Sequence, residues 1–189
     1  LRQSNVHLLV GLRLSITTFW GMASLILPLL IFRASDSAST AAFYASVSLA
    51  CAAGGQLLTG LLRDRYGRTQ PLLVSSTGIV VSALCLAFST ESVPLLFVFG
   101  TALTTTAWAV STLVPALIAE VATKAEKNRL VGLGHFVWST AMVTGSLLGG
   151  WWVEIDPAIP FGFGAVSATI GTWCAWQLCR RLRNIETPD

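Results

Sequence analysis

Six long apolar runs follow one another along the chain, with short polar segments between them. Each run is long enough to cross the ~30 Å hydrocarbon core of a bilayer as a helix, which takes about 20 residues. The runs cover about Leu8–Phe32, Thr40–Leu62, Pro71–Phe88, Val93–Val121, Leu130–Val153 and Pro160–Leu182. They are continuously apolar and lack the period-two alternation of barrel strands. The pattern predicts an all-α integral membrane protein with six transmembrane helices.

Composition agrees with this prediction. Hydrophobic residues make up 53% of the 189 residues and charged residues only 11%. A soluble domain usually carries about a quarter charged residues. The missing charged shell excludes a water-soluble globular domain, and we expect the lipid bilayer to surround the chain.

The charges that remain alternate between the segments joining the spans. Basic residues precede the first span, separate the second from the third and the fourth from the fifth, and follow the sixth: Arg2; Arg63, Arg65, Arg68; Lys124, Lys127, Arg129; Arg180, Arg181, Arg183. The other connections carry Arg33, Asp36, Glu91, Glu154 and Asp156. Basic loops stay on the cytoplasmic side, so we expect both termini in the cytoplasm, in a bacterial inner membrane. The net charge of +3 then reflects topology, and no nucleic-acid partner is expected.

The six spans also read as two copies of three within one bundle over residues 1–189. Gly55-Gln-Leu-Leu-Thr-Gly60 with Asp64 is echoed by Gly145-Ser-Leu-Leu-Gly-Gly150 with Glu154, and Ser24 to Pro28 is echoed by Ser111 to Pro115. Chance similarity among small and apolar residues is the alternative. An odd number of spans per copy makes the repeats, about 8–90 and 93–183, lie inverted in the membrane, as in many secondary transporters.

Polar residues recur at three- and four-residue spacing on several spans. Because unpaired polar groups are costly in lipid, such a stripe must face protein or a water-filled cavity. The first, fourth and fifth spans supply the candidate cavity-lining residues Arg13, Thr17, Trp20, Thr104, Thr105, Trp108, Ser111, Thr112, His135, Trp138 and Ser139. A weaker stripe on the second span contains Tyr44, Ser48, Cys51, Gly55 and Thr59. Helix packing through small hydroxyl residues is the alternative for the Ser and Thr positions.

Two charged or titratable candidates lie near the predicted cytoplasmic boundary. Arg13 is about one turn inside the first span, so its side chain can reach the headgroups, and we favour this over contact with an anionic substrate. His135 lies near the inner end of the fifth span, where we favour a packing or gating role over proton transfer.

The segment after the second span carries the clearest motif. It reads Gly60-Leu-Leu-Arg-Asp64-Arg65-Tyr-Gly67-Arg68, which resembles the G-x-x-x-D-R-x-G-R signature that the major facilitator superfamily places between the second and third helices of a six-helix half. Physically, a tight turn needs glycine at Gly67, where backbone crowding excludes a side chain. The arginines add positive charge on the inside and can bind carboxylates. An ordinary positive-inside loop is the alternative interpretation.

The resemblance implies roles for these residues. In the family, the matching aspartate and arginines form a cytoplasmic latch, so Asp64, Arg65 and Arg68 are expected to do so here. Glu120, at the inner end of the fourth span, resembles the acidic partner, and Arg129 follows it. The Gly145 to Gly150 segment and the pair Pro160-Phe161 also resemble the family, so the similarity covers nearly the whole chain.

One position departs from the family pattern. The N-terminal half of these proteins commonly carries an arginine four residues before a glycine of its fourth helix, but here Leu96 precedes Gly100. The chain also begins at Leu1 rather than Met. We therefore favour the C-terminal half of a twelve-helix carrier over an N-terminal half or a complete six-helix protein.

These observations predict a secondary active transporter, or half of one, that moves a small-molecule substrate by alternating access with a second six-helix half, covalent or as a dimer. A membrane scaffold without transport is one alternative, and an intramembrane enzyme is a weaker one, because the chain has no Gly-x-Ser-x-Gly segment. The four cysteines show no metal or disulfide spacing, and no phosphate-binding loop is present. No catalytic residue, metal or cofactor is therefore expected, and substrate, direction and coupling ion stay open.

Overall fold

The computed structural model describes residues 2–123 and 125–186, with side chains described for 5–120, 122, 123 and 125–183. Arg2 and Lys124 of the predicted inside-positive set therefore lie outside the described side chains. The described residues form only helices and turns, which confirms the all-α prediction. The six helices are α1 (Arg2–Ser35), α2 (Ala38–Tyr66), α3 (Thr69–Ala87), α4 (Val93–Val121), α5 (Lys127–Ile155) and α6 (Ile159–Glu186).

Five of these helices, α1 to α5, are long and apolar enough to cross a membrane. The sixth helix is 28 residues long, but its many glycine, serine, threonine and tryptophan residues make it less apolar by composition. It nevertheless lies inside the bundle, against α1 and α3. The length and position of α6 therefore match a sixth span, although its composition alone is a weaker indication.

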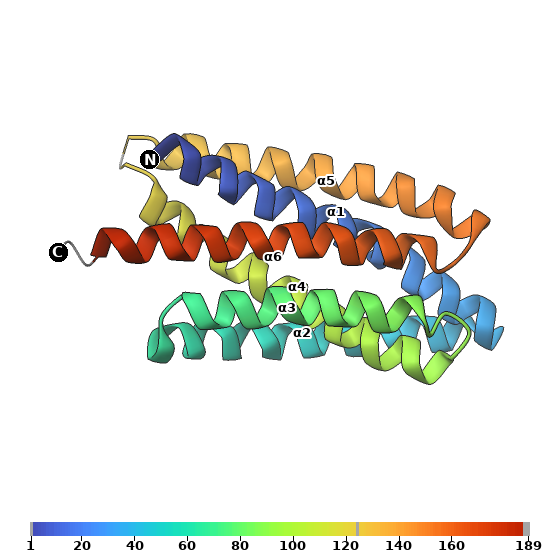
Figure 1. Cartoon of the computed structure of the whole chain (residues 1–189). Helices are drawn as coiled ribbons and strands as arrows, with labels where there is room; N and C mark the ends of the chain where they lie inside the picture. The colour runs from blue at the N-terminus through green and yellow to red at the C-terminus, as the bar shows by residue number, and fades with distance from the viewer. Residues whose placement is uncertain (1, 124, 187–189) are drawn as a thin grey trace.

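The helices run alternately up and down the long axis of the bundle (Figure 1). Both termini lie at one end, together with the α2–α3 and α4–α5 connections, and the other three connections lie at the opposite end. The end of the bundle that holds both termini is called the termini end below. Helix α1 packs against α5, α6 and α4, while α4 in turn packs against α2 and α3. Each of the two, α1 and α4, therefore contacts the second and third helices of the other predicted repeat.

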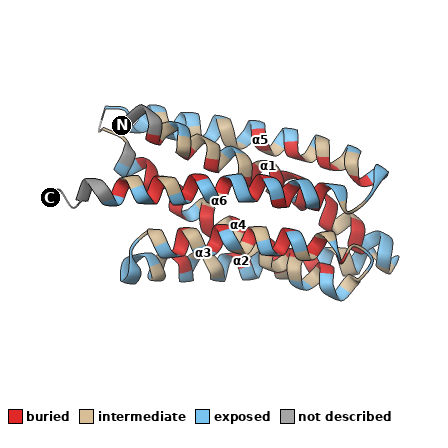
Figure 2. Cartoon of the chain, in the orientation of Figure 1, coloured by how far each residue is buried: buried red, intermediate tan, exposed pale blue. Residues whose placement is uncertain are grey.

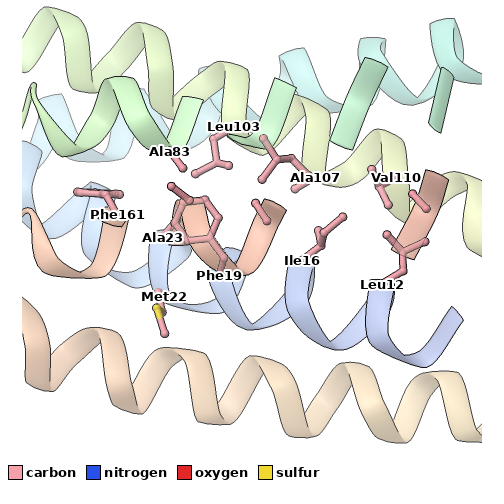
Figure 3. Packing of buried hydrophobic residues seen from close by; sticks show 14 of the residues in the cluster. Leu12, Ile16, Phe19, Met22, Ala23, Ala83, Leu103, Ala107, Val110 and Phe161 are labelled. Atoms are coloured by element: carbon pink, nitrogen blue, oxygen red, sulfur yellow. The ribbon is translucent and has the colours of Figure 1, made fainter. Parts of the chain in front are cut away.

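The core follows the length of α1. Its side chains Leu12, Phe19 and Met22 are fully buried, and buried positions run along α1, α4 and α6 in Figure 2. Figure 3 shows Phe19 and Met22 on opposite sides of α1, with Met22 directed toward α5. By contrast, α2 and α5 expose large apolar side chains such as Leu57 and Leu147. In a membrane protein these exposed side chains are suited to contact lipid or another helical bundle.

Two glycines allow unusually close contact between helices. A Cβ added at Gly145 of α5 would collide with the backbone carbonyl oxygen of Thr18 in α1, and one added at Gly55 of α2 would lie 2.5 Å from the Cγ2 atom of Thr105 in α4. Small residues at helix interfaces permit such close approach in membranes. Gly55 and Gly145 are also equivalent positions in the sequence repeat, so the matching contacts support the proposal that the chain is an inverted repeat.

The turn between α2 and α3 depends on Gly67, but for a different reason than the sequence predicted. No heavy atom lies within 4 Å of an added Cβ at this position among the described residues, so crowding is not the cause. Gly67 instead has φ +75° and ψ 179°, and its N–H donates to the carbonyl oxygen of Arg63 at 2.8 Å. This backbone region is populated almost only by glycine, which explains the residue through conformation alone.

Candidate functional site

Three tryptophans from different helices meet on one side of the bundle. The ring of Trp20 in α1 lies 5.2 Å from that of Trp108 in α4, in an edge-to-face arrangement, and 6.5 Å from that of Trp138 in α5. All three side chains are partly exposed. Edge-to-face pairs are favourable because the positive ring edge meets the negative face. The cluster thus forms an aromatic surface that is accessible from outside the chain.

Arg13 lies next to this aromatic cluster and points toward α4. Its Nη1 donates to the Oγ of Ser111 at 3.0 Å. Its Nε is buried and has no hydrogen-bond partner among the described residues, and the same holds for the Nε1 of Trp108. The guanidinium group thus lies against α4 in this structure, whereas the sequence favoured a side chain directed toward the headgroups.

These side chains line a small hollow between α1, α4 and α5. Its volume is about 20 Å³, which is close to the space needed for a single water molecule. The lining residues are Leu12, Arg13, Ile16, Thr17, Trp20, Ala107, Trp108, Val110, Ser111 and Trp138. We call this hollow the arginine hollow. It is large enough for one polar group of a solute, whereas the rest of that solute would lie over the tryptophans.

A second hollow lies on the other side of Trp20. It has a volume of about 160 Å³ and is lined by residues of α1, α2 and α4: Trp20, Ser24, Pro28, Tyr44, Ala45, Ser48, Leu49 and Thr104. Trp20 lines both hollows. Together they form a partly polar, partly aromatic depression across α1, α2, α4 and α5, the four helices on which the sequence placed polar stripes.

The structure brings together only part of the predicted cavity-lining set. Arg13, Thr17, Trp20, Trp108, Ser111 and Trp138 line the arginine hollow, and Thr104 lines the second one. Thr105 packs instead against Gly55 of α2. The remaining three predicted residues, Thr112, His135 and Ser139, are exposed and line neither hollow.

Several lining residues were not selected from the sequence as cavity candidates. Leu12, Ile16, Ala107 and Val110 were missed because a search for polar stripes ignores apolar walls. Tyr44 and Ser48 belonged to the weaker stripe on the second span. Their distance from Trp20 depends on how α2 packs against α1, which no local sequence pattern reports.

At the termini end, the motif between α2 and α3 contacts the end of α4. The Nη1 atom of Arg68 lies 2.8 Å from the Oε2 atom of Glu120, with the two side chains 19% and 27% exposed. Arg65 lies over the ring of Tyr66, with its Cζ atom 5.3 Å from the ring centroid. Asp64 and Arg129 are exposed and make no ion pair among the described residues. Of the five charged residues predicted for this motif, the structure therefore joins Arg68 and Glu120 and leaves the other three outside this pair.

A second ion pair lies at the opposite end of the bundle. The Nη2 atom of Arg33, in the last turn of α1, lies 2.5 Å from the Oε1 atom of Glu154 near the end of α5. The side chains are 44% and 62% exposed. Such exposed pairs contribute about 0–1 kcal/mol, so this one adds little stability, but it marks how closely the ends of α1 and α5 approach each other.

Acidic side chains are confined to the ends of the described helices. Asp36, Asp64, Glu91, Glu120 and Glu154 all lie within a few residues of a helix end or in a turn. The linings of the two hollows contain no acidic residue among the described side chains. In the same part of the chain, no group of three His, Cys, Asp or Glu side chains is arranged to hold a metal ion.

The described helices thus form a membrane-spanning type of bundle whose two hollows lie across four helices. The family model described as "Major Facilitator Superfamily" matches residues 9–187. The chain therefore belongs to the major facilitator superfamily, as the motif between the second and third helices predicted.

One curated protein and one solved structure are also similar to the chain. The chain is 29% identical over 113 residues to the "Tetracycline resistance protein, class H" of Pasteurella multocida, covering 60% of this chain and 28% of that protein. It also shares its fold with a solved structure titled "Crystal structure of auto inhibited POT family peptide transporter", at a TM-score of 0.78, 19% identity, and coverage of 94% of this chain and 37% of that one. The chain thus spans well under half the length of the relatives it matches.

Proposed function

We propose that the chain is one six-helix half of a secondary transporter that carries a small solute across a bacterial inner membrane by alternating access. The observation that carries this proposal is the depression formed by the two hollows, which combines a partly buried arginine with three tryptophans from three helices. Polar and charged side chains within a membrane span are costly, so those that occur commonly mark a site or a pathway.

A second six-helix half would complete the pathway by covering this face. It would be either part of the same polypeptide or a second copy of the chain. Two glycines of α2, Gly54 and Gly60, have open space around an added Cβ among the described residues, so packing within this bundle does not explain them. Glycine in a helix costs about 1 kcal/mol relative to alanine, and close approach of another helix from a second half would account for it.

We infer that the termini end faces the cytoplasm, because it carries most of the basic connections. On this orientation the Arg68–Glu120 ion pair lies at the cytoplasmic surface and holds the start of α3 against the end of α4. A latch of this kind would bias the protein toward the state that is closed on that side. Two states of a carrier need to differ by only a few kcal/mol, so one partly buried ion pair can alter their ratio.

Cysteine labelling in a background without the four native cysteines tests the proposal. Ser111 lines the arginine hollow, so S111C should react with a charged, membrane-impermeant thiol reagent from either side of a liposome membrane. The control is V81C on α3, whose parent side chain is exposed and apolar and should contact lipid. This variant should not react from either side.

A non-transporting scaffold gives a different result in the same experiment. A scaffold is not expected to open its depression alternately to the two sides of the membrane. Labelling of S111C from one side only, or from neither, would therefore favour the scaffold and contradict alternating access.

A further inference from the structure

The arginine hollow contains hydrogen-bond donors that lack acceptors. The Nη1 of Arg13 donates a hydrogen bond to Ser111. The Nε of Arg13 and the Nε1 of Trp108 are buried and have no hydrogen-bond partner among the described residues. Leaving a buried donor unsatisfied costs about 1–3 kcal/mol, and more for a charged group. Both atoms belong to residues that line the same hollow, so the cost is concentrated at one place.

The charge of Arg13 is also unbalanced within the described residues. A further, apolar hollow of about 20 Å³ adjoins Arg13 on the side toward the termini end, lined by Val6, Leu9, Val10, Arg13, Val114, Ile118, Leu130, Leu133, Gly134 and Val137. Neither this lining nor that of the arginine hollow contains a carboxylate. Arg13 is partly buried in this half and would be covered by a second half. A covered charge is normally paired, so we look for its partner in an anion from outside the described bundle.

The surroundings indicate what kind of anion fits. The arginine hollow is only about 20 Å³ in volume, so it can take one small polar group, and the rest of a solute must lie outside it. Next to it, the rings of Trp20, Trp108 and Trp138 form an aromatic surface. A solute with an anionic oxygen group on a planar ring would satisfy the donors and stack on tryptophan at the same time.

We propose that the transported solute is an aromatic organic anion, whose carboxylate binds Arg13 and the Nε1 of Trp108 while its ring lies on the tryptophans. This inference rests on the proposed transport function and specifies its substrate class. Arg13 is the residue that selects for charge, and the Nε1 of Trp108 is a second donor to the same group. Trp20 and Trp138 select for the ring.

Binding of three probes tests the proposal on the unmodified protein, as its source cell makes it, in phosphatidylcholine nanodiscs. The probes are 2-naphthoate, its neutral analogue 2-naphthamide, and the non-aromatic anion hexanoate, each followed by equilibrium dialysis. We expect 2-naphthoate to bind about tenfold more tightly than either of the others, because it alone satisfies both the donors and the rings. Equal binding of 2-naphthoate and 2-naphthamide would overturn the proposal, and so would equal binding of 2-naphthoate and hexanoate.

Two arginine variants provide the matched comparison. R13Q should lose the preference for 2-naphthoate over 2-naphthamide, whereas R33Q, at an exposed arginine of the same helix, should keep it. If R13Q still preferred 2-naphthoate over 2-naphthamide, the proposed role of Arg13 would be overturned. This is the result expected if a carboxylate of a second half already neutralises Arg13. The probe comparison on the unmodified protein does not depend on whether R13Q folds.

A lipid headgroup is the competing occupant of the arginine hollow. Adding phosphatidylglycerol to the nanodiscs should leave the Kd of 2-naphthoate unchanged, and competition by this lipid would show instead that a headgroup occupies the hollow.

The labelling of S111C separates the substrate class from transport itself. If S111C is labelled from both sides but no probe preference is found, the substrate class is wrong and the transport function stands. If S111C is not labelled from both sides, the transport function itself fails.

Discussion

Arg68 and Glu120 join the start of α3 to the end of α4. Their charged atoms lie 2.8 Å apart at the termini end of the bundle. Both side chains are mostly shielded from solvent, so the attraction is screened less than in a fully exposed pair. This contact is the physical basis of the latch that we propose for the cytoplasmic side.

Removing the charge of Glu120 should therefore open the cytoplasmic side. The variant E120Q keeps the shape of the side chain but loses an interaction of about 1 kcal/mol, which corresponds to a roughly fivefold change in the ratio of two states. We expect labelling of S111C from the cytoplasmic side to rise by about that factor. The matched control is E91Q, at an exposed glutamate in the α3–α4 turn with no ion pair among the described residues. Equal labelling in both variants would contradict the latch.

The contact between Gly145 and Thr18 predicts a strong effect on stability. In G145A the new methyl group would collide with the carbonyl oxygen of Thr18 and lie 3.1 Å from the backbone nitrogen of Met22. Because backbone atoms cannot move aside without separating α1 from α5, we expect a loss of about 1–3 kcal/mol. Thermal unfolding in detergent would show this as a lower Tm.

Gly132 of the same helix is the control for this change. No described atom lies within 4 Å of an added Cβ there, and alanine is the better helix former by about 1 kcal/mol. G132A should therefore keep or slightly raise the Tm. If G132A and G145A lowered the Tm equally, close packing of α1 on α5 would not explain Gly145.

The backbone at Gly67 predicts a cost for any side chain. At φ +75° and ψ 179°, G67A should lose about 1–3 kcal/mol through backbone strain although the space around the new methyl group is open. The control is G162A, a glycine of α6 that is equally open but helical. Chemical denaturation of both variants measures the difference, and a G67A protein as stable as G162A would show that the turn adopts another conformation.

Trp108 allows a test that separates binding from folding. In W108F the ring is largely kept but the buried, unpartnered Nε1 is removed, so the free energy of unfolding without solute should change by no more than about 1 kcal/mol. The stabilisation by 2-naphthoate should fall, since that N–H donates to the carboxylate in the proposed complex. Thermal unfolding with and without 2-naphthoate measures both quantities. A variant that keeps the full ligand-dependent rise in Tm would contradict this donor role.

The sequence placed Trp20, Trp108 and Trp138 on polar faces of their spans, but it did not predict that their rings meet. Trp20 and Trp108 could be assigned to polar faces because helical spacing fixes which residues share one side of a helix. Spacing does not report which neighbouring helix that side meets. For this reason Thr105 was expected in the cavity although it packs on Gly55, and spacing did not show that His135 lines neither of the two hollows.

Arg13 shows that the sequence is equally limited in predicting the direction in which a side chain points. Its position in the first span indicated that its side chain could reach the headgroups, because the sequence gives the distance along the helix axis. The direction of the side chain around that axis depends on how α1 packs on α4, which places the guanidinium group at Ser111. The Arg33–Glu154 pair was not predicted either, since it depends on the pairing of α1 with α5.

The most direct test of the account is exchange of radiolabelled 2-naphthoate across proteoliposomes that contain the protein as its source cell makes it. We expect saturable exchange that is faster than in protein-free liposomes, is lost in R13Q and is retained in R33Q. Exchange no faster than in protein-free liposomes, despite binding of 2-naphthoate to the same protein, would contradict transport through the arginine hollow.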